Sequence, residues 1–172
     1  MFIFVFFADS PKRIRSLIST KFAIQFKKEK FTKSNPYRVA TWQKKNARYP
    51  QIGYVILDDN CEVGCGSTID RGSLSITIIG KNTFLDNQVH VAHNVKIGNN
   101  CIIAGQVGFA GSSTIGNNVM IGGQAGISGH LKIGNNVQIG GGSGVVKNIP
   151  DNSKVMGYPA TDIKNFIKQI KK

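Results

Sequence analysis

Three histidines and a nearby carboxylate are the side chains of this sequence best suited to acid–base chemistry. Residues 86–94, with sequence DNQVHVAHN, contain Asp86, His90 and His93, and His130 is the third histidine. A carboxylate that accepts a hydrogen bond from an imidazole fixes its tautomer and stabilises the imidazolium, so such a pair can act as a general base near neutral pH. A surface histidine without a role is the alternative for each of them, but the grouping of Asp, Asn and His favours catalysis.

A hydrophobic period of six places these side chains on a solenoid. Neither a helix nor an alternating strand has this period. Every third hexad begins with Ile-Gly, so three hexads of 18 residues predict one coil of a triangular parallel β-helix. The phase continues upstream through Leu57, Val63 and Ile69, with four extra residues within 71–77 that should bulge from a corner. Fifteen hexads predict five coils, about 24 Å high at roughly 4.8 Å per strand. The remaining repeat residues are Ile79, Leu85, Val91, Ile97, Ile103, Phe109, Ile115, Ile121, Ile127, Ile133, Ile139 and Val145.

Core and corner positions follow from this register. A second set of mostly small or β-branched residues lies two positions before each repeat residue and should share the narrow interior. The Gly and Asn residues of the three IGNN segments are predicted to supply the positive φ that sharp corners require. Cys61 and Cys101 take the inward position, and Cys61 and Cys65 lack a matching second pair, so neither a metal site nor a disulfide is predicted. Buried thiols indicate a reducing compartment, the cytoplasm.

The basic charge is concentrated at the two ends of the chain. The formal net charge is +13, with twelve Lys and Arg against two Asp and Glu over residues 1–50 and five against one over residues 154–172. Residues 51–153 are nearly neutral, with five against six. The sequence lacks a nucleic-acid recognition motif, so nucleic acid is not a predicted partner. A solvated surface and an acidic protein or phosphate-bearing ligand both remain open.

The chain divides into three predicted segments. Residues 1–48 form a poorly specified basic segment, with helix or loop expected over residues 9–50. The apolar residues 1–8 are too short to span a bilayer and lack a preceding positive region, so at most a peripheral membrane contact is expected. Residues 49–149 form the β-helix. Residues 150–172 form an exit loop and a short amphipathic α-helix, capped by Thr161 and running to Lys172. That helix either packs on the solenoid or on a neighbouring subunit, or offers a cationic surface to an acidic carrier protein.

Two segments are more specific than the hexapeptide period, which many acyltransferases share. These are TIDRG at residues 68–72 and LDNQVHVAHN at residues 85–94. With the rest of residues 49–160, they resemble the UDP-3-O-acylglucosamine N-acyltransferases, which add the second acyl chain in lipid A biosynthesis. The resemblance implies an all-β solenoid, a left-handed parallel β-helix, which is an exception to the usual right-handed crossover rule. It also implies a homotrimer with active sites between subunits.

The resemblance implies a role for each site residue. The family's general base corresponds to His93, its Asp partner to Asp86, and a second functional histidine, one and two-thirds coils further on, to His130. His93 is then expected to take the proton of the glucosamine 2-amine as the amine attacks the thioester of a 3-hydroxyacyl carrier protein, while His130 or a backbone N–H stabilises the oxyanion. No cofactor is expected beyond the phosphopantetheine of acyl carrier protein. Asn87 and Gln88 are expected to bind the substrate, and His90 matches a variable position and is left out.

The run GGGSG at residues 140–144 has almost no side-chain volume. A bulky residue there would limit how far an acyl chain penetrates, so Gly144 is predicted to line the acyl pocket. The alternative is that these glycines serve corner geometry alone.

The family normally carries a uridine-binding domain ahead of the solenoid and a longer helical extension after it. Residues 1–48 do not resemble that domain, so we expect impaired substrate anchoring or nucleotide binding by another protein. Two other functions remain open. One is a non-catalytic trimeric remnant, and the other is a hexapeptide acetyltransferase that uses coenzyme A and a similar interfacial histidine.

Overall fold

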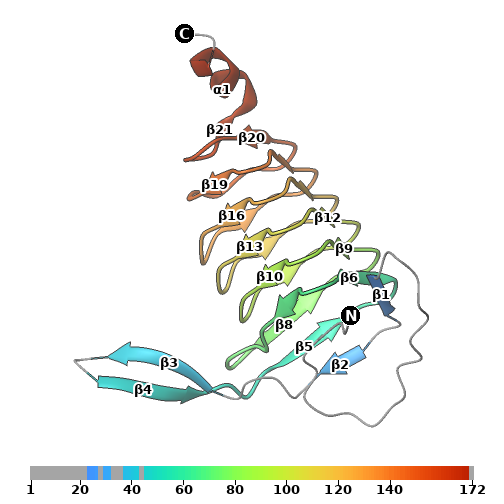
Figure 1. The fold of residues 1–172 in the computed structure, drawn as a ribbon, viewed down its shortest axis with the longest axis vertical. Helices are drawn as coiled ribbons and strands as arrows, with labels where there is room; N and C mark the ends of the chain where they lie inside the picture. The colour runs from blue at the N-terminus through green and yellow to red at the C-terminus, as the bar shows by residue number, and fades with distance from the viewer. Residues whose placement is uncertain (1–22, 27–28, 32–36, 43–44, 171–172) are drawn as a thin grey trace.

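The chain forms a column of short stacked strands, which a computed structural model describes over residues 23–26, 29–31, 37–42 and 45–170. The coils lie one above another, with the α-helix α1 (Ile163–Ile170) at the end farthest from the first strands (Figure 1). Three sheets, in which the stacked strands of the solenoid pair in parallel, form the faces of a prism. The predicted left-handed parallel β-helix is thus confirmed.

Each face is named here by the number of its strands, and consecutive strands of the solenoid lie on different faces. The eight-stranded face contains, in order, β1 (Ala23–Phe26), β6 (Cys61–Gly64), β9 (Phe84–Leu85), β12 (Ile102–Ile103), β15 (Met120–Ile121), β18 (Gln138–Ile139), β20 (Lys154–Met156) and β21 (Thr161–Asp162). The five-stranded face contains β7 (Thr68–Ile69), β10 (His90–Val91), β13 (Gly108–Phe109), β16 (Gly126–Ile127) and β19 (Gly144–Val145). The six-stranded face contains β2 (Glu29–Phe31), β5 (Tyr54–Leu57), β8 (Ile76–Ile79), β11 (Lys96–Ile97), β14 (Thr114–Ile115) and β17 (Lys132–Ile133).

The register between coils explains both the repeat and its one interruption. His90 lies opposite Gly108, 18 residues on. His90 also lies opposite Thr68, which is 22 residues back, so the first coil contains the four extra residues predicted from the sequence. The loop that holds them is fixed, because the Asn94 side chain accepts a hydrogen bond from Ser73 N at 2.8 Å and donates one to Ser73 Oγ at 2.7 Å.

The solenoid is longer than predicted, with about six turns rather than five. The β20 strand pairs in parallel with β18, and Ile149 forms a parallel bridge with Ile133. Gln138 lies opposite Lys154, so this last turn advances by 16 residues. The hydrophobic period of six fails at that shorter turn, which is why β20 lies in the segment predicted as an exit loop.

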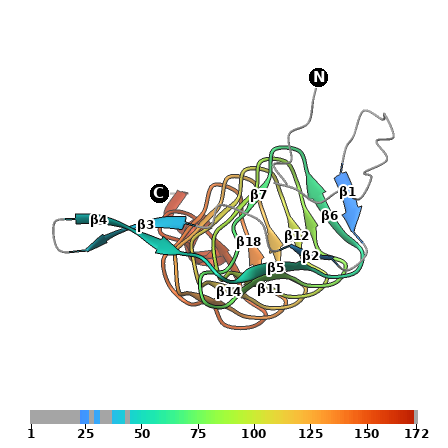
Figure 2. The same cartoon turned by 90° about the horizontal axis from the view of Figure 1, so that it is seen from below.

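The N-terminal strands were not predicted. The β1 strand pairs antiparallel with β6, and β2 pairs antiparallel with β5. The hairpin of β3 (Tyr37–Trp42) and β4 (Lys45–Pro50) projects sideways from the column (Figures 1 and 2). Helix or loop was therefore the wrong prediction for the described parts of residues 9–50. Residues 1–8, with their predicted membrane contact, lie outside the described residues.

The predicted C-terminal helix is present, but its N-cap is a different residue from the one predicted. The backbone N–H of Lys164 donates to Asp162 Oδ1 at 3.0 Å, so Asp162 caps α1 in place of Thr161. Thr161 instead belongs to β21, which pairs antiparallel with β20. Among the described helices, none is long and apolar enough to cross a membrane.

The prism interior contains the two residue sets predicted from the period. Ile79, Val91, Val95 and Cys101 are each at most 2% exposed, and Thr77, Thr83 and Ser113 are fully buried among them. The buried hydroxyls are satisfied: Thr83 Oγ1, for example, donates to Gly98 O at 2.8 Å. Burial raises the pKa of the Cys61 and Cys101 thiols, which donate to backbone carbonyls of the coil. The predicted burial of these two thiols is confirmed.

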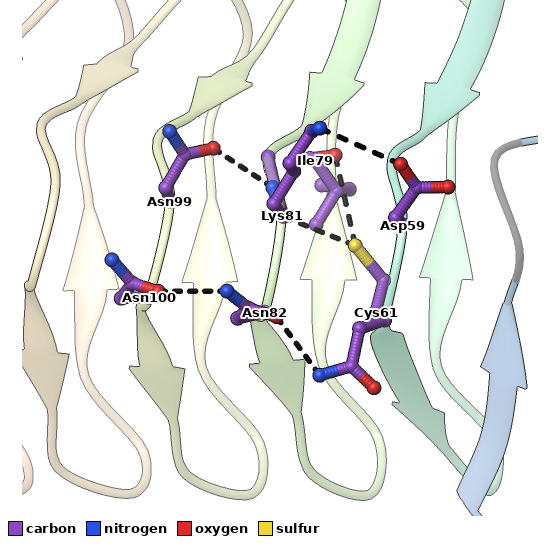
Figure 3. Close-up of polar contacts among 9 residues, drawn as sticks. Asp59, Cys61, Ile79, Lys81, Asn82, Asn99 and Asn100 are labelled. Carbon is purple, nitrogen blue, oxygen red and sulfur yellow. Dashed lines mark hydrogen bonds and ion pairs between the residues drawn. The ribbon is translucent and has the colours of Figure 1, made fainter.

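Asparagines hold the corner between the six-stranded and eight-stranded faces (Figure 3). Asn82 Nδ2 donates to Asn100 Oδ1 at 3.1 Å, and the Lys81 N–H donates to Asn99 Oδ1 at 2.8 Å. The second Asn of each IGNN has a positive φ, as predicted; that of Asn100 is 56°. The glycine serves close packing instead, because a Cβ on Gly98 would lie 2.5 Å from Gly116 O.

A candidate active site at two corners of the solenoid

The predicted site residues lie at two edges of the five-stranded face. We call the edge it shares with the eight-stranded face, at residues 86–89 and their repeats, the Asp86 corner. The edge it shares with the six-stranded face, at residues 92–95 and their repeats, is the His93 corner. Gln88 (φ 59°) and Asn94 (φ 61°) make the turn at each corner within one coil. Both are amide residues, which tolerate this left-handed conformation.

His93 lies half-buried at its corner, with its ring against the next coil. Its Nδ1 atom is buried from solvent. A Cβ on Gly111, one coil further on, would lie 2.6 Å from His93 Cε1 and closer still to Nε2. The Ser112 N–H donates to His93 O at 3.0 Å, which fixes the two coils together at this point. Nε2 is therefore the ring nitrogen directed along the corner.

His130 lies at the same corner as His93. It makes the turn of its own coil, with φ 61°, and its N–H donates to Gly111 O at 3.1 Å. It lies two coils after Asn94 at the equivalent position, about 10 Å along the axis. The predicted separation of one and two-thirds coils from His93 was therefore too short. Its side chain is exposed. The structure thus brings the two histidines to one edge, on either side of Gly111.

Asp86, Asn87 and Gln88 lie together at the Asp86 corner, where they line an open groove of about 430 Å³ with Gly105 and Gly123. All three side chains also make hydrogen bonds that stabilise the fold. Asp86 Oδ1 accepts from the Asn87 N–H at 2.7 Å, and Asn87 Oδ1 accepts from the Cys65 N–H at 2.8 Å. Gln88 Oε1 accepts from Gln106 Nε2 at 2.8 Å, which begins a ladder that continues to Gln124.

Asp86 and His93 do not form a pair within one chain. They lie at successive corners of a single coil, with β10 between them, and an extended side of six residues spans about 15–20 Å. A single chain therefore presents an imidazole on one edge and a carboxylate on another. A contact between them requires a second chain.

A larger groove of about 660 Å³ follows the outer side of the five-stranded face between these two corners. A Cβ on Gly108 or Gly126 would meet nothing within 4 Å, so the middle of the groove is open. Gly144 is buried at its far end, because the ring of Tyr158 occupies the space a side chain there would take. Tyr158 itself is 83% exposed. The predicted acyl-pocket residue thus lies in the groove but beneath this ring.

His90 was left out of the predicted site, yet it lines the same groove. Its exposed ring has Nδ1 2.8 Å from Thr68 Oγ1. The signal in the sequence was its register: a residue directly before a repeat residue points outward on the face. Of the His, Cys, Asp and Glu side chains that the structure describes, no three gather in a way that could hold a metal ion.

Comparison with known proteins supports the hexapeptide-repeat fold. Residues 76–111 and 112–147 match the family described as bacterial transferase hexapeptide (six repeats). A stretch of 50 residues, 29% of the chain, is 60% identical to the UDP-3-O-acylglucosamine N-acyltransferase of Azorhizobium caulinodans and covers 14% of that enzyme. A stretch of 53 residues, 31% of the chain, is 57% identical to the UDP-3-O-acylglucosamine N-acyltransferase 2 of Nitrobacter winogradskyi and covers 16% of it.

Among solved structures, the crystal structure of UDP-N-acetylglucosamine O-acyltransferase from Moraxella catarrhalis superimposes with a TM-score of 0.64 and 29% identity. The match covers 77% of this chain and 51% of that one. The predicted resemblance is confirmed over a partial stretch, and the chain spans only part of the length of the proteins it matches.

Proposed function

We propose that this chain is an acyltransferase that moves a 3-hydroxyacyl group from acyl carrier protein to the 2-amine of a UDP-3-O-acylglucosamine, an N-acylation of lipid A biosynthesis. The observation that carries the proposal is the position of His93, whose Nε2 is directed along the corner against Gly111, a residue that lines the open groove. The relatives named UDP-3-O-acylglucosamine N-acyltransferase support the choice of acceptor. The half-buried imidazole supports general-base chemistry, because its Nδ1 is buried while its Nε2 is directed along the corner.

The proposed reaction is a direct transfer. His93 Nε2 accepts the proton of the amine as its nitrogen forms a bond to the thioester carbon. The tetrahedral oxyanion that results is stabilised by His130 or by a backbone N–H. The C–S bond then breaks, the amide forms, and the proton returns from the imidazolium to the phosphopantetheine sulfur. No covalent acyl-enzyme is required.

The active unit is proposed to be a homotrimer. The separation of Asp86 and His93 on successive corners supports this, because the Asp86 corner of one chain can complete the His93 corner of its neighbour only if the chains assemble. We expect a mass of three times 18.7 kDa by sedimentation equilibrium. A monomer across the concentration range used for activity would contradict an active site between chains.

Gly144→Met is expected to shift donor preference toward shorter acyl chains. The new side chain must displace the Tyr158 ring, which is free to swing outward because it is 83% exposed. The methionine side chain then shortens the groove, and each methylene of the acyl chain that it excludes is worth about 0.8 kcal/mol of burial. The measurement is kcat/KM over a series of 3-hydroxyacyl donors.

Tyr158→Ala is the matched control, since it removes the ring without filling the groove. It should leave the preference unchanged or move it toward longer chains. An unchanged preference in a folded Gly144→Met trimer would assign the glycine run to backbone shape alone.

Turnover with purified donor and acceptor tests the proposed function directly. A 3-hydroxyacyl carrier protein should be consumed only when UDP-3-O-acylglucosamine is present. Consumption of acetyl-CoA instead would indicate an acetyltransferase, and consumption of neither donor would indicate a non-catalytic trimer.

A further inference from the structure

We infer that Gly111 is a positioning residue for His93, because the imidazole occupies the space that a side chain at residue 111 would need. The inference deepens the proposed function, since it concerns the orientation of the proposed base. Among the glycines at the His93 and Asp86 corners, Gly111 is the one at which the atoms nearest to an added Cβ would belong to an imidazole. A Cβ on Gly111 would lie 2.6 Å from His93 Cε1 and 3.0 Å from Cδ2. Real Cβ atoms do not approach other atoms so closely, so one of the two groups would have to move.

The backbone at Gly111 is held from several directions. The Gly111 carbonyl accepts from the His130 N–H at 3.1 Å, and the next residue, Ser112, donates its N–H to His93 O at 3.0 Å. On the other side of Gly111, Ala110 O accepts from Ser113 Oγ at 3.1 Å. Moving the backbone would break these bonds, two of which join neighbouring coils. The peptide at residue 111 is therefore the rigid partner in this contact.

The His93 backbone is fixed as well, so the imidazole is the part that yields. The neighbouring Asn94 N–H donates to Thr77 Oγ1 at 2.9 Å, and the Asn94 side chain binds Ser73. A methyl on Gly111 would then rotate the His93 ring about its two side-chain torsions while the coil stays in place. Such a rotation turns Nε2 away from the corner, and a misplacement of about 1 Å can lower turnover by about 10²-fold.

Gly141→Ala is the matched control. Gly141 occupies the equivalent position of a hexad at the Asp86 corner, where a Cβ would lie 3.2 Å from Gly123 O. That contact tests the cost of adding a methyl between coils without an imidazole beside it. We expect parental histidine spectra from this variant.

The test begins with the free protein and does not require turnover. Long-range ¹H–¹⁵N spectra of the three imidazoles, with the His93 signals assigned by their loss in His93→Ala, report the ring's tautomer and surroundings. In Gly111→Ala the His93 signals should shift and their titration midpoint should change, while the His90 signals stay in place. His93 signals that coincide with the parent's would overturn the inference. Because this readout is independent of catalysis, it stands or falls separately from the proposed function.

Two further measurements distinguish positioning from a general structural defect. Gly111→Ala should lower kcat by about 10²-fold with KM little changed, because one methyl changes the lining of the groove only at Gly111. Its melting temperature should fall in the parental background but not in the His93→Ala background, where the methyl has room. An equal fall in melting temperature in both backgrounds would mean that the new methyl clashes with the backbone and not with the imidazole, which would contradict the inference. This comparison holds even if Gly111→Ala itself folds poorly.

Discussion

His93→Ala is expected to lower kcat/KM for N-acyl transfer by roughly 10²- to 10⁴-fold, the usual contribution of a general base. The trimer and the melting temperature should be retained, since the imidazole lies at a corner and outside the prism core. The measurement is product formation under single-turnover conditions, which isolates the chemical step from product release.

His90→Ala is the control for this loss. It removes a second imidazole from the same coil, but one that lines the face rather than the corner. We expect its effect to remain below about tenfold. Near-parental turnover in His93→Ala would remove the imidazole from the mechanism, and a larger loss in His90→Ala would transfer the role of base to that residue.

Mixing two impaired variants should restore activity, because the carboxylate and the imidazole of one chain lie at different corners. Asp86→Asn should lower turnover by about 10- to 100-fold, since the imidazole loses its orienting partner. In trimers refolded from equal amounts of Asp86→Asn and His93→Ala chains, about a quarter of the interfaces combine an intact His93 with an intact Asp86 from the neighbour. Activity should approach a quarter of the parental value, well above that of either variant alone.

The control is a mixture of the same variants after each has assembled separately. Assayed before chains exchange between trimers, this mixture should give only the mean of the two separate activities. If the refolded mixture also gives only that mean, Asp86 and His93 do not meet across an interface, and Asp86 has a role within its own chain.

The period of the sequence was sufficient to predict the prism. Residues such as Ile79 and Val91 recur at a spacing that only a three-sided coil satisfies, and the structure buries both. The same reasoning failed where side-chain pattern does not determine the backbone. The turn of 16 residues before β20 breaks the period, and Asp162 rather than Thr161 caps α1 because the cap depends on the local turn.

Candidate site residues could be proposed from the sequence, but their arrangement in space could not. The segment DNQVHVAHN identifies Asp86 and His93, which are seven residues apart. That spacing does not show that the chain turns a corner after each of them, at Gln88 and at Asn94. The contact of Gly111 with the imidazole could not be read from the sequence, because it depends on the coil register and on the direction of a side chain. The covering of Gly144 by Tyr158 likewise depends on where the chain returns after the last turn.

The most direct test of N-acyl transfer by this chain is the product formed from 3-hydroxyacyl carrier protein and UDP-3-O-acylglucosamine, identified by mass spectrometry. We expect an acceptor heavier by one 3-hydroxyacyl group attached through an amide at the 2-nitrogen, formed by the parent and not by His93→Ala. A folded trimer that leaves both substrates unchanged, or an equal yield from His93→Ala, would contradict it.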